Sequence, residues 1–330
     1  MSPDARKIVL SGMRPTGPLH LGNLVGALRN WLRLQDIYQC YYMIAGWHSL
    51  SSEYMNPKAI KGNEFEVAVD WLSFGLDPAK CVIFRQSEVK EHAELHLVLS
   101  MITPLPWLER VPTFKEMQQE IQDKDLNTYG FLGYPVLQAA DVVIYKADFV
   151  PVGEDQAAHL ELTREIVRRF NRTIGPLFPE PQTLLTEVPR LAGTDGRKMS
   201  KSFGNAIYLK DPPDVIRKKI LPMVTDTRRM RRTDPGDPND CPVFTLHRAF
   251  VPQARRDEIA HGCRTAGIGC RECKQVVIEA LVAELGPYRE RRLEFEKKPG
   301  LIWDILEDGN AKARRAAQAT MGEVRAALGF

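Results

Sequence analysis

Short apolar runs alternate with amphipathic segments through the first part of the chain. Residues 7–10, 39–45 and 81–84 are apolar runs with the length of buried strands. Apolar residues also recur at helical spacing in five segments. The first starts at residue 24, and the other four cover residues 58–75, 90–102, 133–145 and 155–171. This alternation predicts an α/β fold with a doubly wound parallel sheet, in which ligands bind at the carboxyl ends of the strands.

The pattern changes in the second part of the chain. Beyond residue 210 the strand patterns fade, and helical spacing dominates at 212–221, 254–262, 272–285 and 311–328. A proline-rich connector, residues 176–181, precedes this change. We therefore predict an α/β domain over residues 1–190 and a helical domain over residues 191–330, whose last helix is able to pack back on the first domain.

Composition and charge narrow the class of protein. The chain has 330 residues, 44% hydrophobic and 26% charged, as in an ordinary globular protein. No run approaches the roughly 18 apolar residues that span a bilayer, so we expect a cytoplasmic protein. Residues 1–190 hold 19 Lys+Arg against 23 Asp+Glu, whereas residues 191–330 hold 26 against 19. The basic second half, which includes Arg228, Arg229, Arg231 and Arg232, suits either a phosphate-backbone partner or solvated helix faces.

Two segments have the composition of phosphate-binding sites. After the first apolar run, a glycine-containing turn leads through residues 11–17 to Leu19-His20-Leu21-Gly22-Asn23, where a helix starts. Unpaired amides and the helix dipole at such a start attract anions. The second segment, Lys198-Met199-Ser200-Lys201-Ser202, combines two lysines with hydroxyl donors and follows Gly193 and Gly196. These residue types suit a loop that grips a polyphosphate.

Together the two segments resemble the signatures of the class I aminoacyl-tRNA synthetases, which have a Rossmann-type catalytic domain. The first signature departs from the family pattern at Asn23, where histidine is usual; this variation occurs in the tryptophanyl and tyrosyl branch. The resemblance implies that His20 and Asn23 contact the phosphates of ATP and that Gly22 lets the adenine approach. It also implies that Lys198 and Lys201 follow the leaving pyrophosphate, with Mg²⁺ on the phosphates.

One predicted helix places polar side chains on a common face. Tyr134, Gln138 and Asp141 are spaced by four and three residues, and Val142 and Val143 flank them. A carboxylate in these surroundings is partly desolvated and needs a hydrogen-bond donor. An aromatic ligand with an N–H or O–H group would supply that donor. This chemistry does not separate tryptophan from tyrosine, because both side chains carry a donor.

The wider context is similar to the tryptophanyl-tRNA synthetases over nearly the whole chain. The segments that carry this resemblance are residues 11–17, 134–141, 150–156 and 159–164. Gln138 is a departure, because many bacterial members have methionine there, and it is also found in the tyrosyl branch. The resemblance implies that Asp141 accepts the indole N–H and that Tyr134 and Gln156 hold the α-amino group. The tryptophan-binding residues it implies are Leu10, Met13, His48, Tyr134, Gln138, Asp141, Val150 and Gln156.

The resemblance also implies an ATP site, a tRNA partner and a homodimer. The ATP-binding residues are Arg14, Thr16, Gly22, Asn23, Gly153, Asp155, Lys198, Met199, Ser200, Lys201 and Ser202. The reaction implied is activation of L-tryptophan to tryptophanyl-adenylate, followed by transfer to the 3′-terminal adenosine of tRNA(Trp), with the four arginines at 228–232 on the tRNA. Two alternatives stay open: a tyrosine–tRNA ligase, and a non-catalytic tRNA-binding or redox-sensing relative.

Four of the six cysteines have the spacing of a metal site. Cys241, Cys263, Cys270 and Cys273 follow the pattern C-x₂₁-C-x₆-C-x₂-C, which in a cytoplasmic chain points to metal rather than disulfides. Four thiolates hold either zinc or an iron–sulfur cluster. A subset of tryptophanyl-tRNA synthetases carries a [4Fe–4S] cluster on a very similar pattern, and this resemblance favours the cluster over Zn²⁺. Cys40 and Cys81, within apolar runs, are expected to be small core residues.

Overall fold

The computed structural model describes residues 6–111, 127–153, 157–185 and 190–330. The chain divides into two compact units, and each contains segments that are distant in sequence. Apart from undescribed residues, the first unit consists of Met1–Gly17, Trp31–Thr186 and Lys298–Phe330, and the second of Pro18–Asn30 and Glu187–Lys297. None of the described helices is long and apolar enough to cross a membrane.

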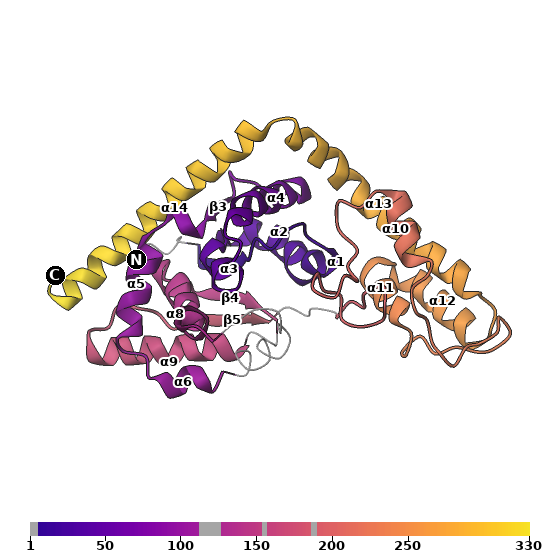
Figure 1. Ribbon diagram of the computed structural model, residues 1–330, viewed down its shortest axis with the longest axis horizontal. Coiled ribbons are helices and arrows are strands. Elements are labelled where there is room, and N and C mark those ends of the chain that lie inside the picture. Colours follow the sequence, from indigo (N-terminus) through magenta and orange to yellow (C-terminus); the bar gives the residue numbers. More distant parts are fainter. Residues whose placement is uncertain (1–5, 112–126, 154–156, 186–189) are drawn as a thin grey trace. The chain divides into compact units, whose positions relative to one another are not determined.

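A five-stranded parallel sheet forms the centre of the first unit (Figure 1). The spatial order is β3-β2-β1-β4-β5. From β1 the chain adds β2 and β3 on one side of the sheet, and it then crosses to add β4 and β5 on the other side of β1. The strand order therefore reverses between β1 and β4. The strands are β1 (Ile8–Met13), β2 (Gln39–Ile44), β3 (Cys81–Arg85), β4 (Phe149–Val152) and β5 (Gln182–Leu185). This confirms the predicted parallel α/β fold.

Helices pack on the sheet because their apolar faces have no other place to be buried. The core of the first unit joins residues of β1 to β4 with residues of α5, α8, α9 and α14, and Figure 1 shows these helices around the sheet. The helices of this unit are α2 (Arg29–Ile37, which starts at the border of the two units), α3 (Gly46–Glu53), α4 (Lys58–Phe74), α5 (Glu91–Ser100), α6 (Leu105–Glu109), α8 (Tyr129–Ile144), α9 (Ala157–Thr173) and α14 (Pro299–Leu328).

Among its described residues the second unit has helices and isolated bridges but no strand, as predicted for this part of the chain. One small apolar cluster contains Phe244, Ile259 and Ala260. The helices are α1 (Leu21–Asn23), which continues as a π-helical turn (Leu24–Leu28), α10 (Pro213–Ile220), α11 (Pro242–Phe250), α12 (Gln253–Arg264) and α13 (Cys270–Glu296).

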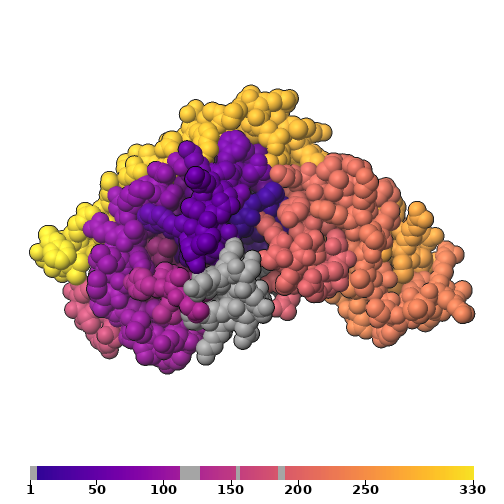
Figure 2. All heavy atoms as spheres, viewed as in Figure 1, coloured from indigo at the N-terminus to yellow at the C-terminus, as the bar shows by residue number. Residues whose placement is uncertain are grey.

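The last helix, α14, covers the edge of the sheet at β3. Gly309 lies so close that an added Cβ would be 1.8 Å from the carbonyl oxygen of Ile83. The next side chain, Asn310, accepts a hydrogen bond of 2.8 Å from the backbone N–H of Arg85. A side chain therefore satisfies a backbone group at the edge strand that no further strand pairs with. In Figure 2 the end of α14, in yellow, lies beside purple residues of the same unit.

Two sets of boundaries differ from our predictions. We did not predict the strands β4 and β5. Each is only four residues long, and β4 contains Pro151, which has no N–H to donate to a neighbouring strand. The predicted helices 272–285 and 311–328 are α13 and α14 in part, and both are longer. Gly309 and Asn310, which directly precede the predicted segment 311–328, are helical and make the contact with β3.

The close packing of Gly309 gives a test of this contact. Gly309→Ala should push α14 from β3 and lower the free energy of unfolding by about 2–4 kcal/mol, through overpacking and loss of the Asn310 hydrogen bond. Gly322→Ala, on the same helix with no atom within 4 Å of an added Cβ, is the matched control. It should gain up to about 1 kcal/mol from helix propensity. Urea unfolding of both variants measures the difference, and equal effects would contradict the packing argument.

Candidate active site

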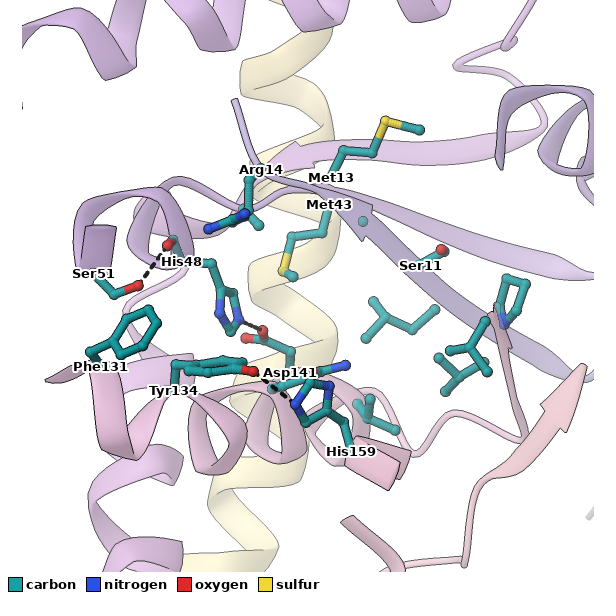
Figure 3. A pocket seen from close by; sticks show the side chains of 18 residues that line it. Ser11, Met13, Arg14, Met43, His48, Ser51, Phe131, Tyr134, Asp141 and His159 are labelled. Carbon is teal, nitrogen blue, oxygen red and sulfur yellow. Dashed lines mark hydrogen bonds and ion pairs between the residues drawn. The ribbon is translucent and has the colours of Figure 1, made fainter. Parts of the chain in front are cut away.

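A cavity of about 330 Å³ opens at the carboxyl ends of β1 and β4, where the strand order reverses (Figure 3). This is the position at which open parallel sheets bind ligands. Seven of the eight predicted tryptophan-binding residues line it, namely Leu10, Met13, His48, Tyr134, Gln138, Asp141 and Val150. The eighth, Gln156, lies outside the described residues. Arg14, predicted to bind ATP, lines the same cavity.

Asp141, on α8, is the buried charge of this site, with 1% of its surface exposed. Its Oδ1 accepts hydrogen bonds from His92 Nδ1 at 2.6 Å and from Gln86 Nε2 at 2.8 Å. Its Oδ2 accepts from His48 Nε2 at 2.7 Å and from Gln86 Nε2 at 2.9 Å. Three residues from different elements therefore satisfy one carboxylate.

These contacts keep the Asp141 carboxyl ionised. Burial alone would raise its pKa, but the charges and hydrogen bonds of His48 and His92 lower the pKa to about 2. Behind His92, its Nε2 lies 2.7 Å from the hydroxyl of Tyr145. Burial, followed by the charge of Asp141, raises the pKa of Tyr145 well above its usual value. The phenol therefore stays protonated and completes the network.

The network corrects our reason for assigning Asp141. We expected the carboxylate to need a donor from the ligand, whereas the protein itself supplies donors to both oxygens. Of the three donors, only His48 also lines the cavity. The sequence analysis missed Gln86, His92 and Tyr145. No periodicity could have found them, because three different elements bring them together.

Tyr134 and His159 form a second polar pair in the cavity. The hydroxyl of Tyr134 lies 2.8 Å from Nε2 of His159, which belongs to α9 and is 1% exposed. Figure 3 shows this pair on the side of the cavity formed by α8 and α9. On the same cavity, Arg14 donates to the Ser52 hydroxyl at 3.4 Å. The cavity thus combines apolar walls with a few fixed polar groups, as ligand sites for small molecules do.

The first signature forms a capped helix start in the second unit. His20 precedes α1, and its Nδ1 accepts from the N–H of Gly22 at 3.0 Å, while Asn23 Oδ1 accepts from the N–H of His20 at 3.0 Å. Burial, and then the positive charge of Lys201, lowers the pKa of His20 to about 4. The imidazole is therefore neutral at pH 7. Because Nδ1 is an acceptor, Nε2 carries the proton and is a donor.

Gly22 has a steric role in this turn. An added Cβ would lie 2.8 Å from Cε1 and 2.9 Å from Nδ1 of His20. Any larger residue would therefore displace the imidazole from its place on the helix start. This constraint exists in addition to the adenine contact that we predicted for Gly22.

The second signature lies on a short hairpin of the same unit. Lys198 forms a bridge with Ala192, and the N–H of Met199 donates to Leu191. Met199 is buried, so its side chain anchors the loop, whereas Lys198 and Ser202 are exposed. Lys201 is near enough to His20 to lower its pKa. The structure thus brings the two signatures together, although 175 or more residues separate them in the sequence.

Two further predicted ATP residues, Thr16 and Gly153, lie after the strands β1 and β4. The N–H of Thr16 donates to the carbonyl of Arg14 at 2.9 Å, directly after β1. Gly153 follows β4. Asp155 lies outside the described residues, and nothing tests its assignment.

Comparison with known proteins agrees with this geometry. The family model described as tRNA synthetases class I (W and Y) matches residues 2–286. The chain belongs to this family of class I synthetases. It is 50% identical to a tryptophan–tRNA ligase of Thermotoga maritima, with 97% of this chain and 98% of the relative covered. It is 43% identical to that of Ralstonia nicotianae, with 98% of each covered.

A solved structure matches the synthetase along its whole length. It is the tryptophanyl-tRNA synthetase of Campylobacter jejuni, in complex with ADP and tryptophan. The TM-score is 0.86 at 34% identity, and the match covers 98% of this chain and 100% of the other. The predicted class and fold are therefore confirmed.

In this synthetase the four cysteines of the C-x₂₁-C-x₆-C-x₂-C pattern line one small cavity of about 20 Å³ in the second unit. Burial, and then the neighbouring thiols, raises the pKa of Cys273 to about 12. Its Sγ lies 3.1 Å from Nε2 of His247. However, the described residues contain no group of three or more His, Cys, Asp or Glu side chains arranged to hold a metal ion. The described side chains therefore do not support the [4Fe–4S] site that we predicted on these cysteines.

The four arginines predicted to bind tRNA differ from one another. Arg229 is 9% exposed, and its guanidinium donates to the carbonyls of Arg232 and Ile268 at 2.9 and 2.7 Å. This position corrects our assignment of Arg229, because its donors hold the loop together. Arg228, Arg231 and Arg232 are exposed. Arg228 pairs with Asp226 and Asp240, and Arg232 pairs with Glu272.

The Asp141 network gives a prediction with a defined pH dependence. Asp141→Asn should lower the free energy of unfolding at pH 7 by roughly 3–5 kcal/mol, because buried imidazole donors lose a charged acceptor. The difference in free energy of unfolding between wild type and variant should be constant down to about pH 5 and shrink below about pH 4. The reason is that the Asp141 carboxyl has a lower pKa in the folded than in the unfolded protein, so its stabilising effect is lost as the pH falls toward 2. Urea unfolding at several pH values measures it. Asp214→Asn, at an exposed site, is the control, and a pH-independent difference would refute the charge argument.

Proposed function

We propose that this synthetase ligates tryptophan to tRNA. The carboxylate of tryptophan attacks the α-phosphate of ATP to give tryptophanyl-adenylate and pyrophosphate. The 3′-terminal ribose hydroxyl of tRNA(Trp) then attacks the acyl carbon of the adenylate and takes the acyl group, and AMP leaves. The observation that carries this proposal is the cavity at the strand-order reversal, with a buried carboxylate inside it. Eight relatives that match over at least 97% of this chain, at 41–50% identity, are tryptophan–tRNA ligases.

Asp141 is proposed to accept the indole N–H. Both of its oxygens already accept two hydrogen bonds, so the indole has to take the place of one donor. His48 is the donor that lines the cavity, and it therefore yields Oδ2 to the ligand. His92 and Gln86 keep Oδ1 in position. A ring that displaces His48 without bringing its own N–H or O–H would leave Oδ2 one donor short, which is the basis for rejecting phenylalanine.

The remaining cavity residues are proposed to orient the substrate. Leu10, Met13 and Val150 contact the ring, and Gln138 faces the same space. The Tyr134 hydroxyl, held by His159, would contact the α-amino group together with Gln156. Holding the amino and indole ends at once fixes the carboxylate for attack.

The ATP site is proposed to use the two signatures. The neutral His20 offers Nε2–H to a phosphate, and Asn23 and the amides at the start of α1 add further donors. Lys198 and Lys201, with Ser200 and Ser202, stabilise the charge that develops on the pyrophosphate. Arg14, Thr16, Gly22, Gly153, Asp155 and Met199 complete the proposed site. Mg²⁺ would arrive on the phosphates and neutralise part of their charge, with no protein ligand assigned.

The proposed partner of the second unit is tRNA. Arg228, Arg231 and Arg232 are exposed on a unit rich in Lys and Arg, which suits a phosphate backbone. A homodimer is also proposed. The support is a set of three large apolar side chains, spaced four residues apart, that remain exposed. The exposed fractions are 56% for Leu97, 74% for Met101 and 59% for Leu105. A role in charging tRNA would place the enzyme in the cytoplasm.

A [4Fe–4S] cluster on the four cysteines remains part of the proposal. The support for it is that the four thiols line one cavity, with Arg229 and Lys274 beside them. Their spacing is also very similar to the pattern of the synthetases that carry a cluster, whereas Zn²⁺ is the alternative for four thiolates. Such a cluster would fix the loops between residues 241 and 273.

Amino-acid-dependent exchange of pyrophosphate into ATP tests the function. Exchange with tryptophan should exceed exchange with tyrosine by at least about tenfold, and phenylalanine should support almost none. Equal or reversed preference would identify a tyrosine–tRNA ligase. Absence of exchange with any amino acid, in protein that is folded, would identify a non-catalytic relative.

Anaerobic purification tests the cluster. The protein should be brown and contain about four irons and four acid-labile sulfides per chain. Cys270→Ser should remove the colour, whereas Cys40→Ser, at a buried strand position, should keep it. Stoichiometric zinc without labile sulfide would show that the alternative metal is correct.

A further inference from the structure

Asn205 follows the lysine signature and has no role in the function proposed above. Its side chain is 2% exposed, and its amide is bonded on both sides. Oδ1 accepts from the N–H of Ser200 at 2.8 Å. Nδ2 donates to Asp195 Oδ1 at 2.7 Å and to the carbonyl of Lys198 at 3.1 Å. Both N–H groups of the amide are therefore used, and all three bonds go to the signature hairpin.

The backbone brings Asn205 into this position. The chain turns back at Lys201–Gly204, where the N–H of Gly204 donates to the carbonyl of Lys201 and Gly204 has φ +64. The carbonyl of Asn205 then accepts from the N–H of Thr194 at 3.0 Å. One residue thus contacts the arm before the signature and the signature itself.

Gly193 is required by the same contact. A Cβ at this position would lie 2.3 Å from Cγ and 2.3 Å from Nδ2 of Asn205. The glycine is not explained by backbone strain, because its φ is not in the left-handed region. It is explained by the Asn205 amide, which occupies the space that any side chain would need.

We propose that Asn205 is a positioning residue for adenylate formation. It fixes the backbone of Lys198–Ser200, so that the Lys198 ammonium and the Ser200 hydroxyl start from a set point when charge develops on the pyrophosphate. A preorganised charge stabilises a transition state without reorganisation, and a displacement of about 1 Å costs of order 10²-fold in rate. This inference rests on the proposed function, because the exchange rate reports on adenylate formation only if that function is correct. The three hydrogen bonds of Asn205, which we call the clamp, do not depend on it.

Asn205→Ala should lower kcat of tryptophan-dependent exchange by about 10–100-fold. The dissociation constant for tryptophan should change by less than about twofold, because no residue of the signature hairpin lines the tryptophan cavity. Exchange kinetics and calorimetric titration of tryptophan measure the two quantities. Asn205→Asp should be slower still, because it places an oxygen against Asp195 Oδ1 and the Lys198 carbonyl.

Asn171→Ala is the matched control. Asn171 also uses one amide to make three hydrogen bonds with loop backbone, at Leu177 and Phe178. It should lower the melting temperature to a similar extent and leave exchange within about twofold of wild type. A loss of exchange in both variants would reduce the Asn205 effect to general destabilisation and overturn the proposal.

A double-mutant cycle tests whether Gly193 and Asn205 act as a pair. Gly193→Ala alone should slow exchange about as much as Asn205→Ala, because the new methyl group displaces the amide. In the Asn205→Ala background the same change should cost much less, because the clashing atoms are absent. Additive effects would show that the two residues act separately, contrary to the proposal.

Limited trypsin digestion tests the clamp without activity. Cleavage after Arg197 and Lys198 should be about tenfold faster in Asn205→Ala than in wild type or Asn171→Ala, because three hydrogen bonds no longer close the hairpin. Unchanged cleavage with unchanged kcat would overturn the inference. Faster cleavage in a protein whose wild type has no exchange activity would instead leave the clamp intact and overturn the proposed function.

Discussion

A single buried carboxylate holds the cavity of the first unit together. Asp141 draws His48 from α3, Gln86 from the turn after β3 and His92 from α5 to one point on α8. An isolated carboxylate at this depth would cost several kcal/mol, so it is tolerated only while these elements stay in place. The elements that shape the cavity and the groups that stabilise its charge are therefore the same. Any change that loosens one of them alters both packing and recognition.

The phosphate-binding signatures follow a different design. Around His20 the donors are backbone amides, a neutral imidazole and flexible lysines, and they are only partly buried. A neutral imidazole donates a hydrogen bond without adding a fixed charge beside Lys201. This suits a reaction in which the charge moves from ATP to the departing pyrophosphate, because the lysines carry most of the response. The cavity around Asp141 is rigid, whereas the two signatures proposed to bind phosphate offer groups with more freedom.

Local patterns were sufficient to predict the first three strands, most helices and both signatures. Each of these is encoded within a few neighbouring residues, so periodicity and glycine positions reveal it. Gln86, His92 and Tyr145 could not be predicted, because only the tertiary fold gives them a common partner. The role of Gly309 was not predicted for a similar reason: its small size serves a contact with Ile83, which is 226 positions earlier in the chain. Arg229 looked like its exposed neighbours in the sequence, and only the fold shows that its donors point inward.

The contact between α14 and β3 has a consequence for biosynthesis. The strands form from residues 8–185, but β3 is at the edge of the sheet, and the Asn310 side chain that accepts from its backbone lies 225 positions later in the chain. While the ribosome is still making the last helix, this edge is open to pairing with another nascent chain. The sheet can thus reach its protected form only after residues 299–328 have been synthesised. Chaperones that cover strand edges should matter most in this interval, and a truncated chain that lacks α14 should aggregate even though every strand is present.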